Sequence, residues 1–125
     1  MLEGINILVA EDNKINQRVI LKTLEKWGAK VGIAENGRVA IEMLTVKPYD
    51  IVLMDMQMPD IDGLEATKVI RQTVVKQPVI IALTANVMTE DKEICFTAGM
   101  NDYISKPVKL EDLMNKLKKW YEIII

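Results

Sequence analysis

Apolar residues in this chain alternate between short continuous runs and stretches with helical spacing. The runs at 5–10, 51–54 and 79–83 are nearly uninterrupted and are bounded by polar or turn-forming residues. Such runs are typical of strands covered on both faces, as in a parallel sheet packed between helices. Two weaker runs, at 29–34 and 102–105, predict further strands, and the lower apolarity of 29–34 places it nearer an edge of the sheet.

Between these runs the apolar residues recur at the period of a helix. Ile20, Leu24 and Trp27 lie at i, i+4 and i+7, and Gly28 can end that helix. A second helix opens at Asn36-Gly37 and is expected to turn Ala40, Ile41 and Leu44 inward. The last helix has the clearest stripe, formed by Leu110, Leu113, Met114 and Leu117.

Capping residues mark two further helices. Asp62 and Glu65 have the spacing of a capping box, starting a helix that carries Leu64 and Ile70. Thr89 precedes two acidic residues and starts another helix, which Gly99 ends. The resulting strand-helix order, repeated five times, predicts one α/β domain over residues 1–125, with a parallel sheet and helices on both faces.

Composition limits the function. Half of the residues are hydrophobic, 27% are charged and the net charge is −2, so the basic face that nucleic acid would require is not expected. No apolar run approaches the roughly 20 residues of a membrane helix, and the first residues do not resemble a signal peptide. We therefore expect a cytoplasmic domain. Zero histidines and one cysteine exclude an imidazole base, histidine ligands and an internal disulfide.

Carboxylates follow two of the predicted strands. Asp55 comes directly after the run 51–54, and Glu11-Asp12 comes after 5–10. Because the carboxyl ends of parallel strands share one edge of a sheet, these groups are expected to converge there. Like charges at this distance repel, and Mg²⁺, which prefers oxygen ligands, would resolve the conflict. A protonated carboxylate, or one turned to solvent, is the alternative that spacing leaves open.

A lysine and a hydroxyl are expected at the same edge. Lys106 follows the fifth strand and Thr84 ends the fourth. Acid, metal and amine together suit an anionic group that is transferred, and a carboxylate can attack phosphorus to give an aspartyl phosphate. Such a transfer depends mostly on positioning and charge stabilisation, which Mg²⁺ and Lys106 would supply. The Lys106-Pro107 bond is a candidate for a cis peptide.

These residues resemble the receiver domain of two-component response regulators. The resemblance rests on Glu11-Asp12, on 53–59 with Gly63, on Thr84-Ala85 and on Lys106-Pro107, and it covers essentially the whole chain. It implies a flavodoxin-like sheet of five parallel strands in the order 2-1-3-4-5. It also implies a signalling domain that assists its own phosphorylation and dephosphorylation, rather than an enzyme with a separate substrate.

The resemblance assigns a role to each matching residue. Asp55 is expected to accept the phosphoryl group and, with Asp12, to bind Mg²⁺ directly, while Glu11 acts near the ion or through water. The backbone carbonyl of Gln57 is the expected third protein ligand. Further expected roles are contact with the phosphoryl oxygens (Thr84 and Lys106), an aromatic switch (Tyr103) and tuning of hydrolysis (Gln57 and Asn86).

The resemblance also implies partners. The phosphoryl donor is expected to be a histidine kinase or a histidine phosphotransfer domain, on the same or another chain. The sequences of residues 11–16, 83–86 and 99–107 are most similar to those of receivers in hybrid sensor histidine kinases. This similarity favours a receiver taken from such a protein over a free-standing regulator. A dimer through the fourth helix, fifth strand and fifth helix is compatible with the resemblance.

Three rival functions are weaker on residue grounds. A phosphatase of the haloacid dehalogenase type needs a second acid two residues after the nucleophile, where this chain has Gln57. A nucleotide-binding domain would carry GxGxxG or GxxxxGK[ST] after a strand, and neither is present. A degenerate receiver that acts only in docking would be expected to lack one of the residues Asp12, Asp55, Thr84 and Lys106, all of which are present.

Overall fold

Strands and helices alternate along the whole chain in the computed structural model, which describes residues 1–85 and 89–124, the side chains of 89–91 excepted. Asn86 therefore lies outside the described residues. The elements are β1 (Asn6–Ala10), α1 (Lys14–Lys26), β2 (Lys30–Ala34), α2 (Gly37–Val46), β3 (Ile51–Asp55), α3 (Gly63–Thr73), β4 (Val79–Thr84), α4 (Thr89–Ala98), β5 (Asp102–Ser105) and α5 (Leu110–Ile124).

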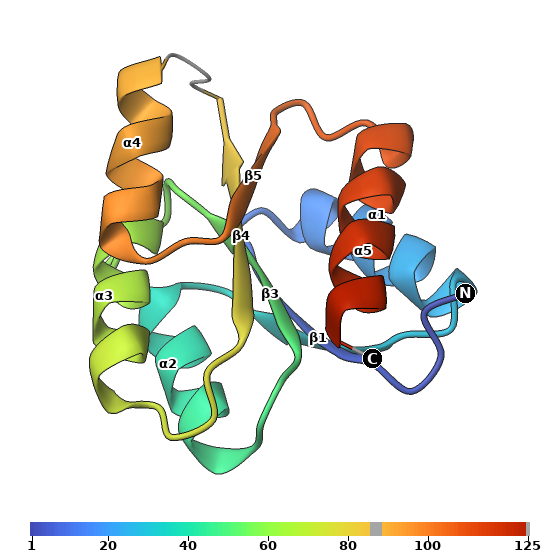
Figure 1. Cartoon of the computed structure of the whole chain (residues 1–125), viewed down its shortest axis with the longest axis horizontal. Coiled ribbons are helices and arrows are strands. Elements are labelled where there is room, and N and C mark those ends of the chain that lie inside the picture. The colour runs from blue at the N-terminus through green and yellow to red at the C-terminus, as the bar shows by residue number, and fades with distance from the viewer. Residues whose placement is uncertain (86–88, 125) are drawn as a thin grey trace.

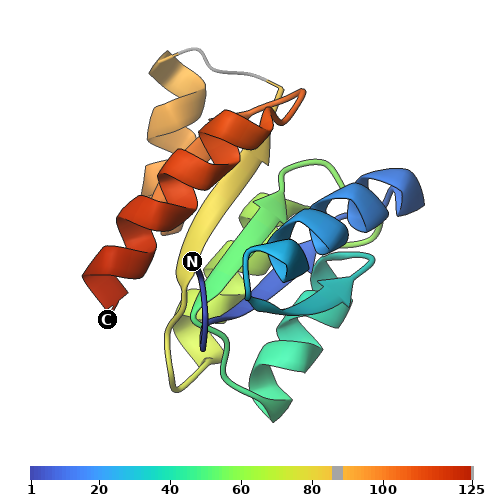
Figure 2. The ribbon, with the colours of Figure 1, turned by 90° about the vertical axis from the view of Figure 1, so that its right-hand side faces the viewer.

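The five strands form one parallel sheet in the order β2-β1-β3-β4-β5. Helices α1 and α5 cover one face, and α2, α3 and α4 cover the other (Figure 1). Turned by 90°, the molecule shows α1 and α5 lying across the sheet on the same side (Figure 2). The predicted fold class and strand order are thus confirmed, and β2 lies at the edge, as its weaker apolarity indicated.

Alternation along the strands divides the core into two clusters, one on each face. Leu8, Val52 and Ile80 belong to the cluster beneath α2, α3 and α4, whereas Ile7, Ile51 and Ile81 belong to the cluster beneath α1 and α5. Since successive residues of a strand point to opposite faces, the central strands must be apolar wherever helices cover both faces. This is the physical reason for the continuous runs in the sequence.

The helix boundaries agree with the predicted caps. Asp62 Oδ1 accepts the Glu65 N–H at 2.9 Å, and Asn36 Oδ1 accepts the Val39 N–H at 2.9 Å. Gly28 and Gly99 follow α1 and α4 with φ of 94° and 110°, a left-handed conformation that glycine adopts without steric cost. Local chemistry therefore determines where these helices begin and end.

The apolar stripe predicted for the last helix is only partly buried. Leu113 and Leu117 are fully buried, but Leu110 is 52% exposed although it shares their helical stripe. Leu110 is the first residue of α5, and its side chain lines a groove that Val19 and Ile20 of α1 also line. The apolar tail continues α5: Trp120 packs against the core, while Ile123 remains largely exposed.

Within the described residues, none of the helices has the length and apolarity required to cross a bilayer.

Candidate functional site

The candidate site lies at the carboxyl ends of β1, β3, β4 and β5. Glu11 follows β1, Asp55 is the last residue of β3, Thr84 is the last residue of β4, and Lys106 follows β5. The strand register brings these ends level, because Asp55 pairs with Leu83 and Thr84 pairs with Ser105. Residues far apart in the sequence thus meet at one edge of the sheet.

Three carboxylates converge at this edge, as predicted. One oxygen each from Glu11, Asp12 and Asp55 lies within 4.8 Å of the others. Glu11 and Asp55 are each 2% exposed, whereas Asp12 is open to solvent. Burial, followed by hydrogen bonding to Asp55, raises the pKa of Glu11 to about 7. The cluster therefore carries more negative charge than its burial tolerates.

Lys106 is the cation paired with this cluster among the described residues. Its Nζ lies 2.7 Å from Asp55 Oδ1, and its side chain is mostly covered. The Lys106 N–H donates to the Thr84 carbonyl at 2.8 Å, which ties the lysine to the end of β4. The Lys106-Pro107 bond is cis, as its sequence allowed. A single ammonium leaves three carboxylates incompletely neutralised.

The start of α1 holds Glu11 in place. The Asn13 N–H donates to Glu11 Oε2 at 3.2 Å, and Asn16 Nδ2 donates to Glu11 Oε1 at 3.1 Å. Both oxygens are thus engaged by α1, which accords with an indirect role at a metal. Neither Asn13 nor Asn16 was predicted to support Glu11. Their position directly after the acidic pair was the available signal.

The loop after β3 is held from two sides. The Gln57 N–H donates to Asp55 Oδ1 at 3.1 Å. Arg38, at the start of α2, pairs with Asp60 through Nε–Oδ2 and Nη2–Oδ1 contacts of 2.7 and 3.2 Å. A Cβ at Gly63 would lie 2.4 Å from the Asp55 carbonyl oxygen, so only glycine allows this close return of the chain. The loop that carries Gln57 is therefore fixed beside Asp55.

The donor set fits a hard divalent cation. Three carboxylates offer oxygen ligands, and the bound charge would relieve the repulsion between Glu11 and Asp55. A pocket of about 200 Å³ adjoins Asp55 and opens towards Thr84 and Lys106. This volume is large enough for a phosphoryl group in contact with both residues.

Tyr103 is half-buried in β5, where aromatic and cationic groups surround its ring. The Phe96 ring meets it edge-on, with 6.4 Å between centroids. The ammonium groups of Lys92 and Lys116 lie 4.8 and 5.2 Å from its centroid. Tyr103 is thus separate from the carboxylate cluster, although it occupies the strand that leads to Lys106.

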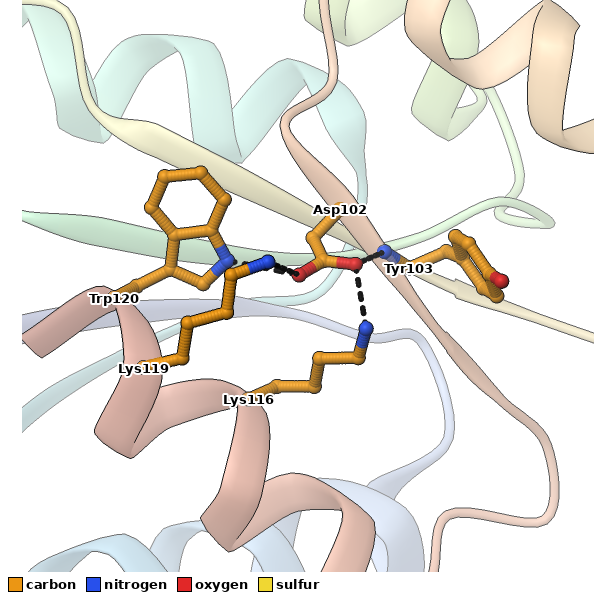
Figure 3. A network of polar contacts seen from close by, with 5 residues as sticks. All are labelled: Asp102, Tyr103, Lys116, Lys119 and Trp120. Atoms are coloured by element: carbon orange, nitrogen blue, oxygen red, sulfur yellow. Dashed lines mark hydrogen bonds and ion pairs between the residues drawn. The ribbon is translucent and has the colours of Figure 1, made fainter.

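The structure also contains a second polar cluster, around Asp102, which was not predicted from the sequence. Asp102 is buried and accepts hydrogen bonds from Lys116 Nζ at 2.8 Å and Trp120 Nε1 at 2.9 Å, with Lys119 Nζ at 3.4 Å (Figure 3). Burial favours a higher pKa for Asp102, but these donors outweigh it and hold the pKa below its ordinary value. In the sequence, Asp102 is an isolated acid at the start of a predicted strand, and this position gave little indication that it would contact side chains of α5.

Comparison with known proteins identifies close similarities. The family model described as the response regulator receiver domain matches residues 7–118. Hybrid signal transduction histidine kinase K of Dictyostelium discoideum is 44% identical over 122 residues, covering 91% of this chain and 10% of that protein. The aerobic respiration control sensor protein ArcB of Escherichia coli is 37% identical over 123 residues, covering 97% and 16%. The chain therefore spans a small part of these relatives.

Two solved structures extend the comparison. The receiver domain of a Saccharomyces cerevisiae response regulator, crystallised with a histidine phosphotransfer signalling protein, has a TM-score of 0.90 and 33% identity, covering 96% of this chain and 90% of that one. The receiver domain of a Pseudomonas aeruginosa sensor histidine kinase, with a magnesium ion in its active-site cleft, has a TM-score of 0.85 and 41% identity, covering 95% and 98%.

Proposed function

The chain belongs to the response regulator receiver domain family and is a receiver domain of a two-component phosphorelay; from this premise we propose that Asp55 is its phosphoacceptor. The observation that supports the assignment is the contact of 2.7 Å between Lys106 Nζ and Asp55 Oδ1 at the end of β3. This contact pairs the buried Asp55 carboxylate with one cation, and two further acids, Glu11 and Asp12, lie beside Asp55. The arrangement suits an anionic group that arrives together with a metal.

Magnesium is the proposed cofactor. Asp12 and Asp55 would bind it directly together with the Gln57 carbonyl, and Glu11 would act near it or through water. The ion supplies charge stabilisation for the transferred group. The support from this chain is the convergence of three carboxylates within 4.8 Å. The support from a relative is the magnesium ion in the Pseudomonas aeruginosa receiver.

The proposed reaction moves a phosphoryl group from an imidazole nitrogen to Asp55. A carboxylate oxygen of Asp55 forms the new O–P bond while the N–P bond breaks, and the electron pair of that bond stays on the imidazole. Lys106 and Thr84 bind the phosphoryl oxygens, where charge develops during transfer. The domain itself provides this stabilisation, so it assists its own phosphorylation and, with water as acceptor, its dephosphorylation.

The donor is proposed to be a histidine on another domain or protein, since none of the 125 residues is histidine. A groove of about 230 Å³ between α1 and the start of α5 reaches from Glu11 and Lys106 to apolar walls. Val19 on α1 and Leu110 line this groove and are 53% and 52% exposed, and Ile15, one helical turn before Val19, is 74% exposed. This surface suits a docked phosphotransfer or kinase domain that presents histidine to the site.

The output is proposed to pass through Thr84 and Tyr103. A phosphoryl oxygen offers Thr84 a charge-assisted hydrogen bond worth about 1.5–3 kcal/mol, enough to shift a two-state equilibrium tenfold or more. Movement of Thr84 would leave space beside β4 that the Tyr103 ring can enter. The surface altered is α4, β5 and α5, through which a downstream partner or a second copy would bind.

Phosphorylation with acetyl phosphate tests the assignment of Asp55. We expect labelling that requires Mg²⁺ and is lost in Asp55→Asn. Asp62→Asn is the matched control, because asparagine also caps helices and Asp62 lies outside the carboxylate cluster. Undiminished labelling of Asp55→Asn would contradict the proposal, as would labelling of the pure protein by ATP.

Donor docking is tested separately with Ile15→Glu. We expect this variant to accept phosphoryl groups from acetyl phosphate at the wild-type rate but to accept them more slowly from a phosphorylated histidine phosphotransfer protein, because the charge falls on the apolar rim. Equal transfer rates from that protein to both forms would place docking elsewhere.

A further inference from the structure

Lys116 contacts two groups that face opposite sides of the sheet. Asp102 and Tyr103 are consecutive in β5, so the aspartate faces α5 while the tyrosine packs against the cluster beneath α2, α3 and α4. Because β5 is an edge strand, a side chain of α5 can reach around it. Lys116 Nζ lies 2.8 Å from Asp102 Oδ1 and 5.2 Å from the Tyr103 ring centroid (Figure 3).

Asp102 fixes the position of this ammonium. Its Oδ1 also accepts the Tyr103 N–H at 2.9 Å, and its Oδ2 accepts Trp120 Nε1 at 2.9 Å. A carboxylate that is 5% exposed and bonded to both the β5 backbone and α5 has little freedom to move. Lys116 is therefore held at the strand edge and cannot follow the Tyr103 ring if the ring moves.

The ammonium stabilises the ring where it now lies. A cation within about 6 Å of an aromatic face is attracted by the ring quadrupole. If the ring moved towards β4, it would leave this contact, so the attraction favours the position seen here. A contact made in one of two states shifts the equilibrium towards that state.

We infer that Lys116 is a positioning residue that restrains the Tyr103 ring and thereby opposes the conformational response to a phosphoryl group on Asp55. The inference rests on the output switch under Proposed function and adds a residue that shifts the equilibrium between the two positions of the Tyr103 ring. Lys116 touches neither the phosphoryl group nor the metal ligands. Its effect reaches them through the position of Tyr103.

Neighbouring lysines provide matched controls. Lys119 pairs with Asp102 at 3.4 Å, and its ammonium lies over the Trp120 ring at 5.0 Å. Lys92, on α4, lies over the Tyr103 ring at 4.8 Å. Substitutions of the three lysines therefore separate loss of the Asp102 contact from loss of the Tyr103 contact.

The test uses the 125-residue chain with Mg²⁺ and beryllofluoride, which mimics the aspartyl phosphate. We expect Lys116→Met to bind beryllofluoride about two- to fivefold more tightly, the range that an exposed cation–π contact allows. Lys92→Met should act in the same direction, Lys119→Met should match the wild type, and Lys116→Arg should restore wild-type affinity. In NMR spectra without beryllofluoride, the Tyr103 ring signals of Lys116→Met should move towards their bound positions.

Several outcomes overturn the inference. Unchanged affinity in Lys116→Met does so, and so does an equal change in Lys119→Met, which would place the effect in the Asp102 anchor. If Lys116→Met does not fold, Lys116→Gln replaces it, since glutamine can donate to Asp102 without a charge over the ring. If the Tyr103 NMR signals of the wild-type protein do not shift when beryllofluoride binds, the proposed switch itself is wrong. This failure can be distinguished from failure of the Lys116 inference, because it is observed without any variant.

Discussion

Asp55 and Asp102 are both buried carboxylates at strand ends, yet their surroundings are opposite. Asp55 lies at the carboxyl end of β3 with Glu11 and Asp12 nearby and with Lys106 as its paired cation among the described residues. Asp102 lies at the start of β5 and has two lysines, an indole N–H and a backbone N–H as donors. One cluster has too few cations, whereas in the other two cations face a single carboxylate.

The pKa values follow this difference. Burial and the Asp55 hydrogen bond raise the pKa of Glu11, whereas Asp102, despite a burial effect in the same direction, has a lowered pKa because of its donors. A buried acid with excess donors joins two elements and can serve as an anchor. Buried acids short of cations retain the capacity to bind one. The balance of charge, not burial alone, therefore separates a binding site from a structural contact.

The largest expected difference between Asp55 and Asp102 is in how asparagine substitution at each position changes the free energy of unfolding. We expect Asp102→Asn to lower the free energy of unfolding by about 2–3 kcal/mol, less than for a fully buried pair because both lysines are partly exposed. Asp55→Asn should instead raise the free energy of unfolding of the metal-free protein by about 1 kcal/mol, since it relieves repulsion. Urea unfolding measures both changes, and equal destabilisation would remove the distinction.

The pH dependence of stability should differ in the same way. Glu11 has a folded-state pKa of about 7 against an ordinary value of 4.5, so the folded metal-free protein binds more protons between these values. The free energy of unfolding should therefore fall as pH rises through this range, by on the order of 2 kcal/mol. Glu11→Gln should abolish that decrease.

Asp102 should contribute in the opposite direction and in another range. Its folded-state pKa is below the ordinary 3.8, so its contribution is present above that pH and is lost as pH falls through the lowered value. Thermal unfolding from pH 3 to 8 would reveal both dependences. A Glu11→Gln variant with the wild-type slope between pH 4.5 and 7 would contradict the assignment to Glu11.

Magnesium should stabilise one cluster and not the other. At ten times its dissociation constant, the ion should raise the free energy of unfolding by about 1.4 kcal/mol. The effect should disappear in Asp12→Asn and persist in Lys119→Met, whose substitution lies in the Asp102 cluster. Sodium chloride at matched ionic strength controls for screening, and equal stabilisation by both salts would refute a specific site.

The smallest effect is expected from the contact that holds the metal loop. Arg38→Ala removes the Asp60 pair and should weaken magnesium binding about twofold, because exposed ion pairs contribute little. Asp60→Asn should match it, whereas substitution of the comparably exposed Lys68, which pairs with Glu65, should leave the affinity unchanged. A loss of tenfold or more in Arg38→Ala would mean that Arg38 acts in the site itself.

Much of the fold could be predicted because local rules dominate it. The nearly continuous apolar runs of β1, β3 and β4 require cover on both faces, and Asp62, Gly28 and Gly99 mark helix ends by their own chemistry. The site acids could be predicted because strand ends of a parallel sheet share one edge. The exposure of Leu110 could not be predicted, because helical spacing does not state how far the core extends beneath a helix.

The order of elements, the apolar faces and the chemical groups at each strand end follow from residue type and spacing alone. Which polar groups become partners depends instead on the packed fold. Asn16 reaches Glu11, Arg38 reaches Asp60, and Lys116 reaches both Asp102 and Tyr103. Such contacts join side chains from different elements, and their formation depends on how the helices pack against the sheet, which no local pattern specifies.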